Sequence, residues 1–100
     1  MKKEARVRTF SPVLQEALDA IPQHLKKRID WSFEISDRID VLLKRKGMTR
    51  KEFARKAGCT ENEVSRWLCG THNFTLATLA RISDALGEDI IRVVKTRKQD

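Results

Sequence analysis

Four polar residues in the second half of the chain have the types and the spacing to contact another molecule: Glu61, Asn62, Ser65 and Arg66. Positions i, i+1, i+4 and i+5 form one stripe on an α-helix, and these side chains bring both donors and acceptors of hydrogen bonds. A helix with such a stripe fits the major groove of B-form DNA, where its first turns reach the edges of the bases. The chemistry that the stripe indicates is recognition of duplex DNA.

Nothing comparable in the sequence indicates catalysis. The chain has no tyrosine, no glycine-rich phosphate loop and no supported Ser-His-Asp or Cys-His grouping. Cys59 and Cys69 do not have the spacing of a zinc site, and His24 and His72 do not supply the histidine pair that such a site uses. We interpret the two cysteines as reduced thiols that behave as small apolar side chains. We therefore expect no enzymatic activity, no catalytic residue, no metal and no cofactor.

The charge balance also favours a polyanionic partner. The chain has 100 residues, a net charge of +7 and a pI near 9.9, which favours nucleic acid first and an anionic membrane surface second. No apolar stretch approaches the roughly 18 residues that span a bilayer, and the basic N-terminus lacks the apolar run of a secretory signal. We expect a single cytoplasmic domain that does not insert into a membrane.

Two capping signals define the helices around the stripe. Thr49 and Glu52 fit a capping box, and so do Thr60 and Glu63. Between the two predicted helices, Gly58 allows a left-handed backbone and a steep turn. Gly70 is expected to close the second helix, which we place at residues 60–69. The expected inward residues are Phe53, Ala54, Ala57, Val64 and Trp67.

Further helices must cover these two, because short helices cannot bury their apolar faces alone. Ser11-Pro12 predicts a helix start with a serine cap, and Pro22 ends that helix and can open the next. Residues 25–43 predict either one long helix or two helices with a bend near residues 31–32, ending at Gly47. Thr75 predicts the cap of a last helix, which ends at Gly87 and buries Leu76, Leu79, Ile82 and Leu86.

The predicted fold is all-α, a repressor-like domain of five to six helices. Residues 1–31 are interpreted as a basic N-terminal arm, with weak strand-like alternation over residues 5–10, followed by a helical extension. Residues 32–88 are interpreted as the DNA-binding domain. Residues 89–100 form the tail, in which the β-branched stretch 90–94 is compatible with a short strand.

Residues 35–86 resemble the repressor/Cro-type helix-turn-helix domain, the xenobiotic-response-element (XRE) class of bacterial and phage regulators. The resemblance covers about half of the chain and is specific for the fold rather than for the DNA target. The matching residues are Ile39, Leu42, Gly47, Met48, Thr49, Glu52, Phe53, Ala54, Ala57, Gly58, Cys59, Thr60, Val64, Ser65, Arg66, Trp67, Gly70, Leu76, Leu79, Ile82, Ala85, Leu86 and Gly87.

The resemblance implies roles for individual residues. Glu61, Asn62 and Arg66 match positions that face base edges, together with Ser65 on the same stripe. Arg66 then suits guanine O6 and N7, Asn62 suits adenine N6 and N7, and Glu61 suits the amino group of cytosine. Positions that contact the phosphate backbone are matched by Arg50, Lys51, Thr60, Thr71, His72 and Asn73; such contacts set register and affinity without reading sequence.

The chain departs from the family pattern at two places. Many members pair an arginine with a glutamate where this chain has Leu43 and Leu68, and the joint exchange of an ion pair for an apolar pair is physically reasonable. Phe74 stands where a proline is common. Separately, Trp31 and Phe33 are compatible either with the core or with a contact to another subunit.

The leading hypothesis is a transcriptional regulator, more specifically a repressor, that binds a two-fold symmetric site on double-stranded DNA as a homodimer. The alternative is the antitoxin of a toxin–antitoxin pair, which binds a co-encoded toxin protein and regulates its own operon. A third hypothesis is an interaction domain that has kept the fold and lost DNA binding.

Overall fold

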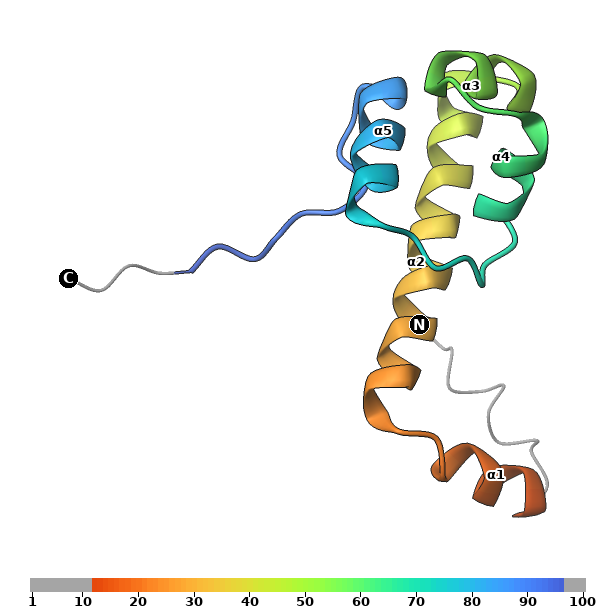
Figure 1. Ribbon diagram of the computed structural model, residues 1–100, viewed down its shortest axis with the longest axis vertical. Coiled ribbons are helices and arrows are strands. Elements are labelled where there is room, and N and C mark those ends of the chain that lie inside the picture. The colour runs from red at the N-terminus through yellow and green to blue at the C-terminus, as the bar shows by residue number, and fades with distance from the viewer. Residues whose placement is uncertain (1–11, 97–100) are drawn as a thin grey trace.

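The helix boundaries follow the capping residues of the sequence. In the computed structural model, which describes residues 12–96, the chain forms five α-helices (Figure 1). They are α1 (Pro12–Asp19), α2 (Gln23–Lys46), α3 (Arg50–Ala57), α4 (Glu61–Trp67) and α5 (Leu76–Leu86). This arrangement confirms the predicted all-α class. The predictions for the basic arm, for residues 5–10 and for the serine cap at Ser11 lie outside the described residues.

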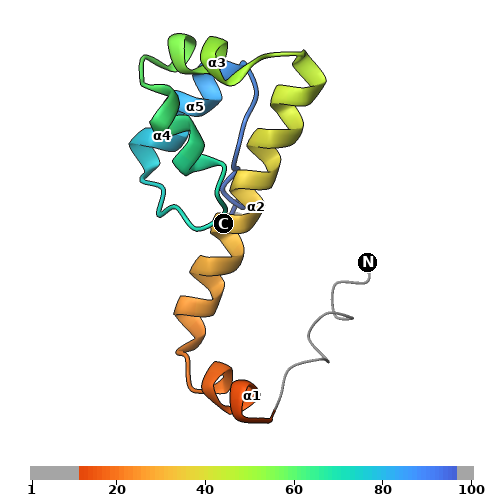
Figure 2. The same ribbon diagram turned by 90° about the vertical axis from the view of Figure 1, so that its right-hand side faces the viewer.

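The long helix α2 is continuous, so the alternative with a bend near residues 31–32 is wrong. It begins after Pro22 and ends at Gly47, whose left-handed backbone (φ 61°) lets its N–H reach the carbonyl oxygens of Leu43 and Lys44. In both views, α1 and the N-terminal part of α2 extend away from the bundle formed by the other helices (Figures 1 and 2). The first buried residue along α2 is Ser32.

The core is made where α2 meets α3, α4 and α5. Its fully buried side chains are Ile39, Leu42, Phe53, Val64 and Ile82. Burying one such side chain stabilises the folded state by about 1.5–3 kcal/mol compared with leaving it exposed. The Phe53 and Trp67 rings meet edge to face at 5.7 Å. The leucines that replace the family's ion pair suit this environment, since Leu43 is buried and Leu68 packs against the same core.

Some apolar side chains that keep the spacing of a helix face are exposed, including Leu76, which was expected to be buried. On α2, Ile29 and Phe33 keep the helical spacing but are 42% and 53% exposed, because no described helix covers that part of α2. Trp31 is 60% exposed, so the interpretation of Trp31 and Phe33 as core residues is wrong. On α5, Leu76 is 75% exposed because it lies in the first turn, beyond the reach of the core. No residue of α1 is buried.

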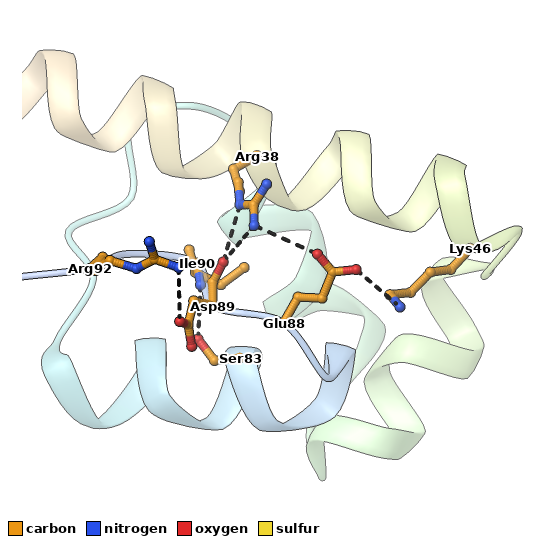
Figure 3. Close-up of polar contacts among 7 residues, drawn as sticks. All are labelled: Arg38, Lys46, Ser83, Glu88, Asp89, Ile90 and Arg92. Atoms are coloured by element: carbon orange, nitrogen blue, oxygen red, sulfur yellow. Dashed lines mark hydrogen bonds and ion pairs between the residues drawn. The ribbon is translucent and has the colours of Figure 1, made fainter.

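The segment after α5 folds back onto α2 without forming a strand. Figure 3 shows Arg38 of α2 donating two hydrogen bonds to the Asp89 carbonyl oxygen, at 3.2 and 2.8 Å. Ile90 is buried, and its N–H donates to Ser83 Oγ at 3.1 Å. The expectation of a short strand at residues 90–94 is wrong: residues 12–96 contain no strand, and a strand needs a partner strand for its backbone hydrogen bonds.

None of the helices within residues 12–96 is both long enough and apolar enough to cross a membrane.

Candidate nucleic-acid interface

Helices α3 and α4 form a helix-turn-helix whose turn is set by Gly58 (Figure 2). Gly58 has a φ of 72°, and its N–H reaches the carbonyl oxygens of Ala54 and Arg55 at the end of α3. A residue with a side chain rarely adopts this conformation, whereas glycine adopts it without steric cost. The chain therefore reverses direction sharply after α3, so that α4 begins shortly after α3 ends and packs beside α2.

The capping box at the start of α3 is complete. Glu52 N–H donates to Thr49 Oγ1 at 3.1 Å, and Thr49 N–H donates to a Glu52 carboxylate oxygen at 2.9 Å. The bond from the Thr49 N–H lowers the pKa of Glu52, since it stabilises the charged carboxylate. Both predicted bonds of this box are confirmed.

The second predicted box forms only in part. Thr60 Oγ1 accepts from Glu63 N–H at 3.2 Å, so Thr60 is the N-cap of α4. Among the described residues, the Glu63 side chain makes no hydrogen bond back to the Thr60 N–H, so the reciprocal half of the box is missing. Burial, with a contribution from Glu63, raises the pKa of Cys59. The carboxylate that sequence reasoning assigned to the cap thus lies close enough to the thiol in the turn to affect its pKa.

The four residues of the stripe are all exposed on α4: Glu61, Asn62, Ser65 and Arg66. Behind them, Val64 is fully buried and Trp67 is 3% exposed. The inward and outward faces of α4 thus lie as predicted.

The helix ends earlier than the predicted residues 60–69. Leu68 is its C-cap in a right-handed conformation, so Gly70 follows the helix rather than closing it. The carbonyl oxygen of Trp67 accepts a hydrogen bond from the buried Ser36 hydroxyl of α2. This bond satisfies a carbonyl that the short helix leaves free and ties the end of α4 to α2.

Arg50, a predicted phosphate contact, lies next to Ser65, a residue of the predicted base-reading stripe. Its Nη1 lies 3.4 Å from Ser65 Oγ, across the gap between α3 and α4. Arg50 and Lys51 are both exposed in the first turn of α3. The guanidinium keeps most of its donors free, because arginine carries five N–H groups in a planar fork. The structure therefore brings Arg50 and the stripe of α4 onto one surface.

The loop between α4 and α5 carries the remaining predicted phosphate contacts. Thr71 and Asn73 are exposed, whereas His72 is half-buried, with its ring edge-on to Phe74 at 4.8 Å. Phe74 packs against the core, which anchors the loop where the family commonly has a proline. The Thr71 hydroxyl lies 3.3 Å from Cys69 Sγ, and this hydrogen bond lowers the pKa of Cys69.

Sequence reasoning missed the residues that hold the helix-turn-helix in place. Arg81 of α5 donates from Nε and Nη2 to the Ala57 carbonyl oxygen, at 3.3 and 3.0 Å, and so caps the end of α3. Ser36 performs the equivalent task for α4. Both partners are distant in the sequence, and neither residue belongs to a local motif that would have signalled its role.

Within the described residues, no group of three histidine, cysteine, aspartate or glutamate side chains is close enough to hold a metal ion.

Comparison with known proteins identifies the same region. Residues 38–91 match the family model of the Cro/C1-type HTH DNA-binding domain. The matched region covers more than half of the chain, and it includes α3, α4, α5 and the segment that Arg38 holds. No curated protein and no solved structure matches the chain.

Proposed function

Because the chain belongs to the Cro/C1-type helix-turn-helix DNA-binding family, we propose that it is a sequence-specific transcriptional regulator without enzymatic activity. In this proposal the protein acts in the cytoplasm as a repressor, occupies the major groove with α4, and blocks access to the DNA that it covers. The observation that carries the proposal is the exposed stripe of Asn62, Ser65 and Arg66 on a helix whose opposite face, Val64 and Trp67, is buried.

The stripe and its surroundings divide into two kinds of contact. Arg66, Asn62 and Glu61 read base edges, with a good bidentate pair worth about 1–3 kcal/mol of discrimination. The backbone contacts are made by Arg50, Lys51, Thr60, Thr71, His72 and Asn73, which orient α4 in the groove. The 3.4 Å contact between Arg50 and Ser65 supports this division, since it holds a phosphate-binding cation directly beside the base-reading stripe.

We also propose that the regulator binds as a homodimer to a two-fold symmetric site. Helix α4 has only 7 residues, so one copy reaches few base pairs. Two copies on half-sites about 34–36 Å apart double the number of base contacts.

The direct test is selection of bound fragments from a random DNA pool, followed by titration of the selected site. Arg66→Ala is expected to reduce preference for the selected site about 5- to 150-fold while keeping the salt dependence. Arg50→Ala is expected to weaken binding to all DNA and to lower the salt slope by about one. The matched control is Arg92→Ala, which removes the same charge from the tail.

Two results would contradict the proposal. If the pool yields no preferred sequence, the protein does not read bases. If Arg66→Ala and Arg50→Ala change specificity and salt slope in the same way, the division into base readers and phosphate contacts is wrong.

A second candidate function is that of an antitoxin that binds a co-encoded toxin protein and uses its DNA contacts for autoregulation. The observation in its favour is α1, which buries no residue and exposes Val13 (76%) without a role in holding the DNA-binding fold. We expect a neighbouring reading frame that encodes a basic, ribonuclease-like protein, and a stable complex when the two are co-expressed. The absence of such a complex would exclude this candidate.

A further inference from the structure

One face of α2 is uncovered along the part that extends from the bundle. We call it the outer face of α2 and define it by Lys26, Ile29, Asp30, Phe33 and Asp37. These positions follow the three- and four-residue spacing of a single helix face, and none of them is buried. Along the same part of α2, the residues that are buried are Ser32 and Ser36.

The apolar residues of the outer face are held in place rather than loosely exposed. The Phe33 ring lies directly on the backbone of Gly70: a Cβ at position 70 would be 2.7 Å from Phe33 Cε1. The ring is nevertheless 53% exposed, and Ile29 beside it on the helix is 42% exposed. A fixed aromatic ring with a free outer surface is typical of a protein–protein contact.

The charges of the outer face are ordered along the helix. Lys26 is at its N-terminal end, Ile29, Asp30 and Phe33 are in the middle, and Asp37 is at its C-terminal end. Within residues 12–96, the carboxylates of Asp30, Glu34 and Asp37 have no hydrogen bond or ion pair. Together with Phe33 they line a groove whose other lining residues include Leu68, Cys69 and Gly70, and Arg50 of α3 also borders it.

We propose that a second copy of this chain docks on the outer face of α2, with the two α2 helices antiparallel. Lys26 and Asp37 each lie about 8 Å along the axis from the midpoint of the face, at a rise of 1.5 Å per residue. A two-fold axis through that midpoint places Lys26 of each copy opposite Asp37 of the other. It brings Ile29, Asp30 and Phe33 of both copies to the centre, with Asp30 of each copy opposite Phe33 of the other.

The order of charges favours a second copy over other occupants. A two-fold contact requires a patch that is its own complement, and the two ends of the outer face, Lys26 and Asp37, complement one another when the face is reversed. Asp30 stays unpaired near the two-fold axis, which weakens the contact without changing the pairing of the ends. On the outer face itself, a DNA backbone would be repelled by the carboxylates of Asp30 and Asp37, whereas the phosphate contact assigned to Arg50 is on α3, at the border of the groove. This inference rests on the proposed function, because a two-fold symmetric DNA site requires a two-fold symmetric protein.

The same contact has a consequence for DNA recognition. The groove is bordered by residues 68–70, which follow directly after α4 and lead into the loop 71–73. Docking at the outer face therefore fixes the distance between the two α4 helices. A single pair of helices is smaller than a standard interface of about 800 Å² per partner, so we expect a weak dimer in free solution that DNA tightens by mass action.

A charge exchange tests the pairing of Lys26 with Asp37. Sedimentation of the full chain over a concentration series gives the dimer dissociation constant. Lys26→Glu alone and Asp37→Lys alone are each expected to raise it about tenfold or more, since both ion pairs of the dimer become repulsions. An equimolar mixture of the two variants restores association, because the introduced glutamate of one chain then faces the introduced lysine of the other. Lys27→Glu is the matched control, since its side chain is rotated about 100° around α2.

A second variant addresses the apolar centre of the face. Phe33→Ala is expected to weaken self-association by a similar factor, while the thermal midpoint of unfolding shows whether the monomer stays folded. Unchanged association in both single charge variants, or no recovery in their mixture, overturns the proposal. A wild-type chain that remains monomeric both alone and on DNA also overturns it. The proposal is also wrong if Lys26→Glu abolishes the binding of a co-encoded protein and leaves self-association unchanged.

The failure of this inference is distinguishable from failure of the proposed function. If the variants still bind the selected DNA site as dimers with wild-type affinity, the outer face is not the interface and the regulator proposal stands. If no preferred DNA sequence exists, the regulator proposal fails whatever the sedimentation result.

Discussion

Two arginines contact the same residue of the tail, and removing them one at a time tests which contact holds the fold. Arg38 of α2 donates twice to the backbone carbonyl oxygen of Asp89 and lies 3.8 Å from Glu88. Arg92 lies 3.7 Å from the Asp89 carboxylate, with side chains 84% and 68% exposed. Figure 3 shows both arginines contacting Asp89, Arg38 from α2 and Arg92 from within the segment after α5.

The expected losses of unfolding free energy differ because the two environments differ. Hydrogen bonds from a charged donor contribute about 1.5–3 kcal/mol when they are shielded, and the Arg38 side chain is 39% exposed. The longer ion pair to Glu88 adds about 0–1 kcal/mol. We expect Arg38→Ala to cost about 1–2 kcal/mol, which is about 4–16 °C in thermal midpoint for a domain of this size. Arg92→Ala is expected to stay within about 0.5 kcal/mol of the wild type.

The measurement is urea unfolding followed by tryptophan fluorescence. Trp67 is 3% exposed and reports the loss of the core, whereas Trp31 is already 60% exposed and changes little. The slope of free energy against urea is expected to be the same in both variants, because the exposed surface on unfolding is unchanged. Equal stability of Arg38→Ala and Arg92→Ala would refute the argument that the backbone contact, rather than the surface ion pair, fastens the tail to α2.

Three further outcomes follow from local geometry. The hydrogen bond from the Thr49 N–H lowers the pKa of Glu52 in the folded protein. The stabilisation from this carboxylate is therefore fully present above the ordinary pKa of 4.5 and is lost as the pH falls through the lower pKa of the folded state. The difference in thermal midpoint between wild type and Glu52→Gln is expected to shrink below pH 4.5. Cys69 is exposed with a lowered pKa, whereas burial raises the pKa of Cys59, so mass spectrometry after brief alkylation at mild alkaline pH is expected to find Cys69 modified first. Gly58→Ala meets no atom within 4 Å of the new Cβ, so its cost in a thermal melt is expected to be backbone strain alone, about 1–2 kcal/mol.

The local signals of the sequence were sufficient for the helix boundaries around the candidate site. Thr49, Thr60 and Thr75 each cap the helix that was predicted to follow them. Gly47 and Gly58 take the left-handed conformation expected at helix ends. These signals work because a cap is formed by residues within one turn of one another, so neighbouring sequence contains all the atoms involved. The outward orientation of the stripe on α4 followed in the same way from helical periodicity.

The end of α4 and the second capping box depended on contacts that local patterns do not contain. The Glu63 side chain does not bond back to the cap, and the carbonyl oxygen of Trp67 at the end of α4 accepts a hydrogen bond from Ser36 of another helix. The pattern of a threonine followed three residues later by a glutamate indicates only which capping hydrogen bonds are possible. The neighbours in space determine which of the competing bonds does form.

Composition and periodicity thus sufficed for an all-helical chain with a helix-turn-helix and an outward polar stripe, because these properties depend on residues a few positions apart. Burial required the assembled structure: Phe33 and Leu76 keep apolar spacing but are exposed, since no other helix reaches them. The same holds for the contacts of Arg38 and Arg81, whose partners lie 51 and 24 residues away. Such pairs are brought together by the packing of whole helices, and a single sequence carries no local pattern that announces them.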